Sequence, residues 1–224
     1  MCRSKFLTSF AASSALLFST ASYADLADFA RPSLSVGASA QSSAIKVNNW
    51  SNAVFGSGAG TLNGTAGNQQ SLSLAGSYGF YTVYNFVNTV GLSVDITKPS
   101  LLSDPNGAFL ATPYSDVKQK KRYSYFTEPG MLIAPSTLGY LKFSLNVLGI
   151  NDPNSAQSIQ SQNFVGIGYG VGVKTLVDAH WALSLEAQQI NYKAKSDIVV
   201  NGATNPASAK PSQSMATLGL HYFY

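Results

Sequence analysis

The last twelve residues of the chain, Gln213 to Tyr224, alternate without a break between two kinds of side chain. The first set is apolar or aromatic and comprises Ala216, Leu218, Leu220, Tyr222 and Tyr224. The second set is mixed and comprises Met215, Thr217, Gly219, His221 and Phe223. This alternation predicts a β-strand, because successive side chains leave opposite faces of the pleat. An apolar strand with a free edge promotes aggregation, so it needs partners on both sides. A closed barrel provides them by joining the last strand to the first.

Seven further segments of nine to thirteen residues alternate in the same way. They are 33–41, 70–80, 88–97, 121–133, 138–148, 164–176 and 181–193. These lengths match the roughly 9–11 residues that a tilted strand needs to cross a bilayer. Charged residues make up only 11% of the chain, against about 25% in an average soluble domain. The composition therefore indicates strands that face lipid, and we expect the last strand to pair with 181–193 and with 33–41.

The connections between these segments alternate in length. Those at 42–69, 98–120, 149–163 and 194–212 are long and polar, whereas 81–87, 134–137 and 177–180 are short. Long loops on one side and short turns on the other are typical of outer-membrane barrels. A soluble β-sandwich also alternates, but it needs neither four long loops at one end nor such charge-poor strands. The sequence predicts an all-β fold: an eight-stranded antiparallel up-and-down transmembrane β-barrel with short periplasmic turns and four long extracellular loops.

The N-terminus has the features of a secretory signal peptide. Arg3 and Lys5 precede an apolar stretch at 6–18, and Ser22-Tyr23-Ala24 forms a cleavage site. A membrane anchor is the alternative, but the stretch is too short and too polar. We therefore predict a signal peptide at 1–24, a barrel at 25–224, and export to the bacterial outer membrane. Cleavage would remove Cys2, the only cysteine, and with it any thiol or disulfide chemistry.

The alternation also predicts where the charges lie. A charge on the lipid face costs about 2–4 kcal/mol at mid-depth. If the apolar face of each strand meets lipid, six charged side chains point inward: Asp95, Arg122, Glu128, Lys142, Lys174 and Glu186. This lumen charge network is neutral, and we expect Glu128 or Glu186 to pair with Lys142 or Lys174, because buried charges need partners. The network could plug the lumen or line a pore. An eight-stranded barrel is just wide enough for side chains to fill, which favours a plug.

Other chemistry finds little support in the sequence. The glycines at 166, 168, 170 and 172 alternate within a strand, whereas a nucleotide loop lies between a strand and a helix. We interpret them as leaving room for bulky neighbours. His180 and His221 are too few for a zinc site, and both lie away from the outer leaflet, which disfavours a lipid-modifying enzyme. The basic run at 118–122 is short and indicates a solvated segment rather than a nucleic-acid interface. We expect no enzyme activity, cofactor or metal.

Several segments resemble the small OmpA-like and opacity-type outer-membrane β-barrel proteins, a porin-like family. These are Glu128-Pro129-Gly130-Met131-Leu132-Ile133 with Tyr140-Leu141-Lys142-Phe143, the glycine-alternating strand, the segment W-A-L-S-L-E-A ending beside Glu186, and the aromatic C-terminus. The resemblance covers the chain from about residue 70 onward. It implies that Leu220, Tyr222 and Tyr224 form a C-terminal assembly signal for the barrel-assembly machinery, with Tyr224 where the family commonly has Phe. No peptidoglycan-binding domain follows the barrel, so the anchoring role of OmpA-like proteins is not expected.

These observations predict a structural or surface-interaction role, similar to that of an adhesin, with a mostly plugged lumen. A narrow porin for small solutes is the first alternative, and an outer-membrane lipid-modifying enzyme is the second. The expected partners are outer-membrane lipid and lipopolysaccharide, the barrel-assembly machinery, and host or extracellular ligands bound by the loops. No nucleic-acid partner is expected.

Overall fold

The computed structural model describes residues 25–52, 56–63, 69–83, 86–102, 117–151, 162–198 and 207–224. Eight long strands form the barrel: β1 (Pro32–Asn52), β3 (Gln70–Val83), β4 (Phe86–Asp95), β6 (Val117–Ala134), β7 (Thr137–Asn151), β8 (Gln162–Leu176), β9 (Trp181–Tyr192) and β11 (Ala207–Phe223). Three short strands extend the sheet: β2 (Gly56–Asn63), β5 (Ser100–Leu102) and β10 (Lys195–Ile198). A 3₁₀ turn, η2 (Leu26–Asp28), precedes β1. The predicted signal peptide lies outside the described residues.

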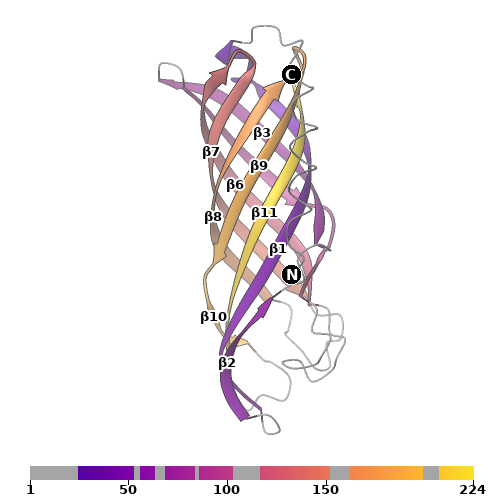
Figure 1. Cartoon of the computed structure of the whole chain (residues 1–224), viewed down its shortest axis with the longest axis vertical. Coiled ribbons are helices and arrows are strands. Elements are labelled where there is room, and N and C mark those ends of the chain that lie inside the picture. The colour runs from indigo at the N-terminus through magenta and orange to yellow at the C-terminus, as the bar shows by residue number, and fades with distance from the viewer. Residues whose placement is uncertain are drawn as a thin grey trace, which may run out of the picture.

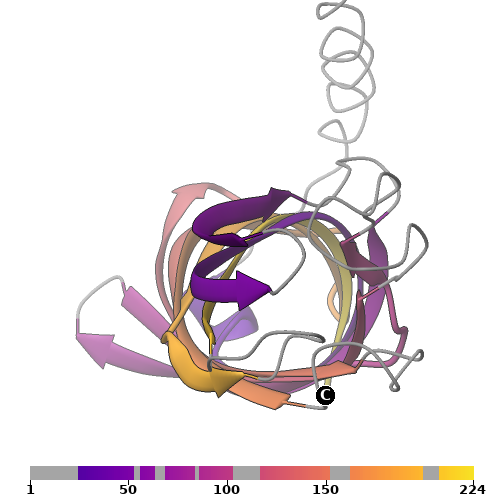
Figure 2. The ribbon, with the colours of Figure 1, turned by 90° about the horizontal axis from the view of Figure 1, so that it is seen from below.

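The eight long strands close into a ring in which neighbours in the sequence are antiparallel neighbours in space. The order is β1-β3-β4-β6-β7-β8-β9-β11, and β11 returns to β1. Figure 1 shows the strands running diagonally around a tall barrel, and Figure 2 shows the ring from one end. The closing seam runs from Ser33 opposite Phe223 to Asn48 opposite Ser208, and β11 pairs with β9 on its other side. Both predicted pairings of the last strand, and the predicted eight-stranded barrel, are confirmed.

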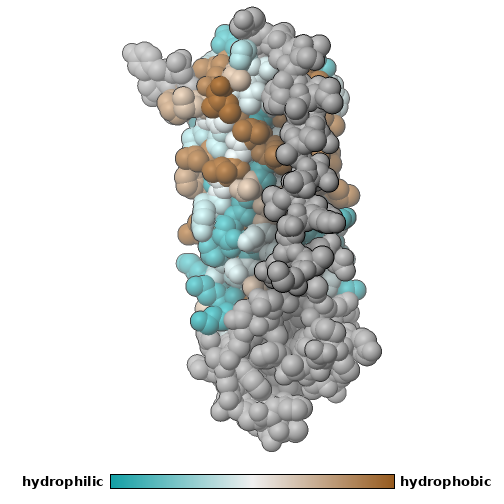
Figure 3. Space-filling view, in the orientation of Figure 1, coloured by the Kyte–Doolittle hydropathy of each residue, from teal (hydrophilic) through white to brown (hydrophobic). Residues whose placement is uncertain are grey.

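Large apolar side chains point outward along every long strand. Leu34, Leu92, Leu145, Ile167 and Leu218 are examples, each with more than half of its surface exposed. Figure 3 shows such residues gathered over the part of the visible wall nearer the short turns, with polar residues below them. We call this region the apolar band. Among the described residues no helix is long and apolar enough to span a bilayer.

The strands are longer than the sequence predicts at the long-loop end of the barrel. The segment 42–69 was expected to be a loop, but β1 continues to Asn52 and forms a hairpin with β2. β6 begins at Val117 inside the expected loop 98–120, which also holds β5, and β10 lies inside the expected loop 194–212. At the other end, β3 and β4 shorten the expected connection at 81–87. These boundaries were wrong because backbone hydrogen bonds continue the ladder beyond the segments in which apolar and polar residues alternate strictly.

The turn at 177–180 agrees with its prediction. The Asp178 carboxylate accepts hydrogen bonds from the backbone N–H groups of His180 and Trp181, at 2.7 and 2.8 Å. These two bonds hold the pKa of Asp178 below its usual value. The side chain therefore acts as a local backbone cap that fixes the turn between β8 and β9.

The leader before β1 folds back into the short-turn end of the barrel. Leu26 and Phe29 are buried in a cluster with Val87, Leu138, Leu176, Ala182 and Phe223. The Phe29 and Phe223 rings meet edge to face, 6.3 Å apart, and the Arg31 guanidinium lies over Phe223 and donates a 2.7 Å hydrogen bond to the Ala179 carbonyl. We call this apolar group the leader plug. The sequence predicts only a short leader here, and its docking inside the barrel is new information from the structure.

Candidate functional site

Four charged side chains of the predicted network meet in the middle of the barrel. Lys142 Nζ lies 2.8 Å from Glu186 and 3.3 Å from Glu128, and Lys174 Nζ lies 3.2 Å from the other Glu128 oxygen. Lys174 and Glu128 are almost completely buried. The four residues come from β6, β7, β8 and β9, so the chain of ion pairs crosses half of the ring. Two acids and two bases neutralise each other, which offsets the cost of removing them from water.

Aromatic rings surround these ion pairs. Lys142 Nζ lies 4.4 Å from the centre of the Phe126 ring, and Lys174 Nζ lies 5.3 Å from that of Tyr140. The Tyr140 hydroxyl donates a 3.3 Å hydrogen bond to Glu186. The ring faces attract the two ammonium groups and fill the volume between them. We call this group of residues the charged layer.

A glycine gap in β8 makes the charged layer possible. In the sheet register, Gly172 lies between Tyr140 of β7 and Glu186 of β9. A Cβ atom on Gly172 would overlap the Tyr140 ring. The missing side chain therefore lets the Tyr140 hydroxyl pass over β8 and reach Glu186. Gly168 does the same for Ser144, which accepts a 2.6 Å hydrogen bond from Gln188.

We expect Gly172→Val to lower the free energy of unfolding by about 1–3 kcal/mol, the usual cost of overpacking. The valine would displace the Tyr140 ring and break its bond to Glu186. Urea unfolding of the barrel in lipid vesicles measures the effect. The double variant Gly172→Val/Tyr140→Ala should lose less than the two single variants added together, because each change relieves the other. Strict additivity would contradict this account of the glycine gap.

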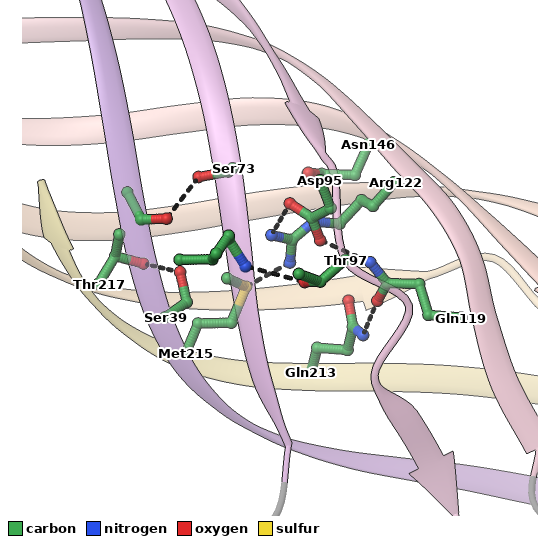
Figure 4. Close-up of polar contacts among 12 residues, drawn as sticks. Ser39, Ser73, Asp95, Thr97, Gln119, Arg122, Asn146, Gln213, Met215 and Thr217 are labelled. Carbon is green, nitrogen blue, oxygen red and sulfur yellow. Dashed lines mark hydrogen bonds and ion pairs between the residues drawn. The ribbon is translucent and has the colours of Figure 1, made fainter.

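The remaining predicted pair, Arg122 and Asp95, forms a second polar layer nearer the long loops. The Arg122 guanidinium lies 2.9 Å from the Asp95 carboxylate, which also accepts a 2.5 Å hydrogen bond from Gln119. Arg122 contacts the Met215 sulfur as well. Figure 4 shows these side chains converging from β4, β6 and β11, with Gln213 beside Gln119. Asp95, Gln119 and Gln213 are all deeply buried.

Between the two layers lies a small polar cavity of about 70 Å³. Its walls include Arg122, Glu128, Lys142 and His221, together with several serines of β1 and β3. At roughly 10–15 Å³ per water, it has room for about five to seven water molecules. Two of its lining residues, Ser124 and Asn146, each have a buried side-chain oxygen without a hydrogen-bond partner among the described protein groups, which suits a polar, hydrated site.

The structure separates the two histidines. His221 points inward, and its Nε2 lies 2.9 Å from Ser184 Oγ. Its Nδ1 is buried without a partner among the described residues, so no described carboxylate orients this ring as the acid of a catalytic triad would. His180 is exposed in the turn after β8 and stacks on Tyr222. Within the described residues, no three His, Cys, Asp or Glu side chains group closely enough to hold a metal.

The predicted assembly residues lie at the short-turn end of β11. Leu220 and Tyr224 are exposed on the lipid-facing wall, and Tyr222 is half-buried against Trp181 and Tyr224. Phe223, which lies between Tyr222 and Tyr224 in the chain, points into the leader plug. Sequence reasoning missed this inward role of Phe223, as well as Gln119 and Tyr140. The alternation of their strands places Phe223 and Tyr140 inside and was the available signal for them. Gln119 points inward only because β6 has an extra residue at Lys120, and the alternation gave no signal for it.

The sequence matches no family model, and it matches no curated protein. Solved structures do share its fold. The outer-membrane protein OprG from Pseudomonas aeruginosa aligns with a TM-score of 0.56 and 13% identity, covering 87% of this chain and 96% of that one.

Two further barrels align less closely. Ail, the attachment invasion locus protein of Yersinia pestis, was solved with a heparin analogue and gives a TM-score of 0.44 at 12% identity, over 87% of this chain and 99% of that one. The outer-membrane protease OmpT from Escherichia coli gives 0.43 at 9% identity, over 92% and 99%. The closed ring of strands and the alignment with OprG give this chain the fold of a small outer-membrane β-barrel protein.

Proposed function

We propose that the chain is an integral protein of the bacterial outer membrane, exported through a cleaved signal peptide. Its barrel would serve a structural or surface-interaction role, with a mostly plugged lumen and the long loops available to extracellular ligands. The relation to OmpA-like and opacity-type proteins, and recognition by the barrel-assembly machinery through Leu220, Tyr222 and Tyr224, belong to the same proposal. The likeness in fold to OprG supports the membrane assignment.

One observation carries the plugged lumen. The leader plug, the charged layer and the Arg122–Asp95 layer follow one another along the barrel, and the cavity between the two polar layers has a volume of only about 70 Å³. Side chains fill an eight-stranded barrel unless they are small. The charged side chains of the two layers are paired with each other, so moving them aside would expose unpaired charges.

We expect the folded barrel, reconstituted in planar lipid bilayers in concentrated KCl, to give no discrete conductance steps. Single-channel recording makes the measurement, and a large porin inserted into the same bilayer serves as the positive control. A gel shift between boiled and unboiled samples verifies that the barrel is folded. Regular steps whose size rises with KCl concentration would contradict the plugged lumen and favour a narrow channel.

The narrow channel is the second candidate, and the unpartnered Ser124 and Asn146 atoms in the cavity wall favour it. Such atoms suit a water-filled passage more than a dry plug. The leader plug and two paired charge layers stand against it. A lipid-modifying enzyme has one supporting contact, Ser184 with His221, but this pair faces the small internal cavity rather than the lipid.

A further inference from the structure

The charges on the outside of the barrel are divided between its two ends. Eight exposed lysines lie toward the long loops: Lys46, Lys98, Lys118, Lys120, Lys121, Lys193, Lys195 and Lys210. The acids whose side chains are described lie elsewhere. Asp95, Glu128 and Glu186 are buried inside, and Asp25, Asp28 and Asp178 lie at the short-turn end. The described wall at the long-loop end is therefore strongly basic.

Four further aspartates in the sequence, at positions 104, 116, 152 and 197, lie outside the described side chains. Even if all four faced this end, eight lysines against four aspartates would leave a net charge of +4. The excess of positive charge at this end does not depend on how those loops are arranged.

The lysines form two patches, the first of which lies across the closing seam. Lys46 of β1 is directly opposite Lys210 of β11 in the register. In the pairing of β11 with β9, Ser212 is opposite Asn191. Lys193 lies two residues beyond Asn191 and so continues the row of lysines on the β9 side of β11. Lys195 pairs with Ala209 beside it. We call these four lysines the seam patch. Opposed residues lie about 4.5–5.5 Å apart, and like charges there are destabilising.

The second patch depends on a β-bulge in β6. The register between β6 and β7 shifts between Gln119 and Lys121, so Lys120 is an extra residue in β6. As a result Gln119 and Arg122 both point inward to Asp95, while Lys120 and Lys121 are both exposed. A bulge redirects side chains in this way. Lys118 is also exposed, and Lys98 precedes Pro99, whose carbonyl accepts a hydrogen bond from Gln119. We call Lys98, Lys118, Lys120 and Lys121 the bulge patch.

We propose that the seam patch and the bulge patch bind phosphate groups of the outer-leaflet lipid, namely lipopolysaccharide. A phosphate between opposed ammonium groups converts their repulsion into charge-assisted hydrogen bonds. This inference rests on the proposed outer-membrane location and adds to it a specific lipid contact.

The position of the patches favours a lipid over a soluble polyanion. On β6, Lys121 comes two residues before the lipid-facing Tyr123, and on β1, Lys46 comes six residues after Ala40. At about 3.3 Å per residue, Lys121 lies roughly 7 Å from Tyr123 and Lys46 roughly 20 Å from Ala40 along their tilted strands. Lysine side chains extend toward the interface while their carbon stems cover apolar surface. The patches therefore lie on the wall, where phosphates of an anchored lipid would surround the barrel.

The test uses the full mature chain folded in a zwitterionic detergent and four probes: rough lipopolysaccharide, the same lipopolysaccharide after removal of its phosphates, phosphatidylglycerol, and free polyphosphate. Binding is measured by calorimetric titration at two salt concentrations, with EDTA present to remove bridging cations. The variants are Lys46→Gln/Lys210→Gln for the seam patch and Lys118→Gln/Lys120→Gln/Lys121→Gln for the bulge patch. Lys46→Arg/Lys210→Arg keeps the charge. Ser42→Ala/Ser214→Ala is the matched control, because these residues are an exposed opposed pair on the same two strands.

A lysine near an anionic lipid surface strengthens binding about fivefold, so the seam variant should bind phosphorylated lipopolysaccharide about 30-fold more weakly. The arginine variant and the serine control should bind like the parent. Salt should weaken binding, and lipopolysaccharide should bind more tightly than phosphatidylglycerol. Equal binding of the dephosphorylated probe, or unchanged binding by both glutamine variants, would overturn the proposal. Tighter binding to free polyphosphate than to lipopolysaccharide would overturn the lipid assignment. These outcomes test lipid binding by the purified protein alone. The proposed function would instead be refuted by discrete conductance steps or by a location outside the outer membrane, so the two failures can be told apart.

Discussion

Glu128→Gln is expected to lower the free energy of unfolding of the barrel by about 3–5 kcal/mol, the usual cost of breaking a buried ion pair. Glu128 accepts from both lysines of the charged layer, and it is the only acid within ion-pair distance of Lys174 among the described residues. The substitution keeps the shape of the side chain but leaves the Lys174 ammonium buried without a counter-charge. Urea titration in lipid vesicles, followed by the fluorescence of the lipid-facing Trp181, measures the loss.

Two matched variants separate charge from packing at this site. In Glu186→Gln, Lys142 keeps Glu128 as its partner, so the loss should be clearly smaller. In Glu128→Gln/Lys174→Met, the unpaired charge is removed together with its partner, and most of the lost stability should return. If the double variant were as unstable as Glu128→Gln alone, the damage would come from packing, and the electrostatic account of the charged layer would be wrong.

Deletion of Phe223 and Tyr224 is expected to impair assembly of the barrel in the membrane. Phe223 is buried in the leader plug, and its N–H donates a 2.7 Å hydrogen bond to the His180 carbonyl. The N–H of Tyr224 donates to the Pro32 carbonyl at the start of β1. Loss of a buried Phe ring alone costs about 3–5 kcal/mol, and the deletion also opens the first hydrogen bonds of the seam. The fraction of folded protein in isolated outer membranes, read from the gel shift between boiled and unboiled samples, makes the measurement.

Point variants distinguish the two roles of this terminus. Tyr224→Phe keeps a terminal aromatic and should assemble normally. Phe223→Ala removes only the inward ring, so it should assemble but unfold at a lower urea concentration. Tyr224→Ala removes only the outward ring, so it tests the predicted assembly signal. Normal insertion of the two-residue deletion would be incompatible with the terminus having either role.

The lipid-facing wall and the interior were predictable from one property of the sequence. Leu34, Leu92 and Leu218 lie outside as their parity predicts, and no described charge lies in the apolar band. The reason is local, since a strand sends alternate residues to opposite faces whatever its partners are. A charged side chain facing lipid is costly. The face of each strand that carries no charge can therefore be identified as the lipid-facing one without a structure.

The contacts inside the lumen were predictable only as a set of alternatives. The sequence allows Glu128 or Glu186 to pair with either lysine, whereas the structure joins Lys142 to both acids and Lys174 to Glu128. These contacts depend on the stagger of four strands and on the gap at Gly172, which sets how far Tyr140 reaches. A pattern along one strand carries no information about the level at which a distant strand crosses the barrel.

The sequence by itself therefore determined the number of crossing strands, their faces, the order in which they pair and the closing seam. Period-two alternation and the alternation of loop length specify these features residue by residue. Tertiary structure alone decided the docking of Leu26 and Phe29 in the leader plug, the extension of β1 beyond the alternating segment 33–41, and the bulge at Lys120. Each of these arises from contacts or hydrogen bonds between residues far apart in the chain. Polar or short segments form such contacts without any periodic pattern that would predict them.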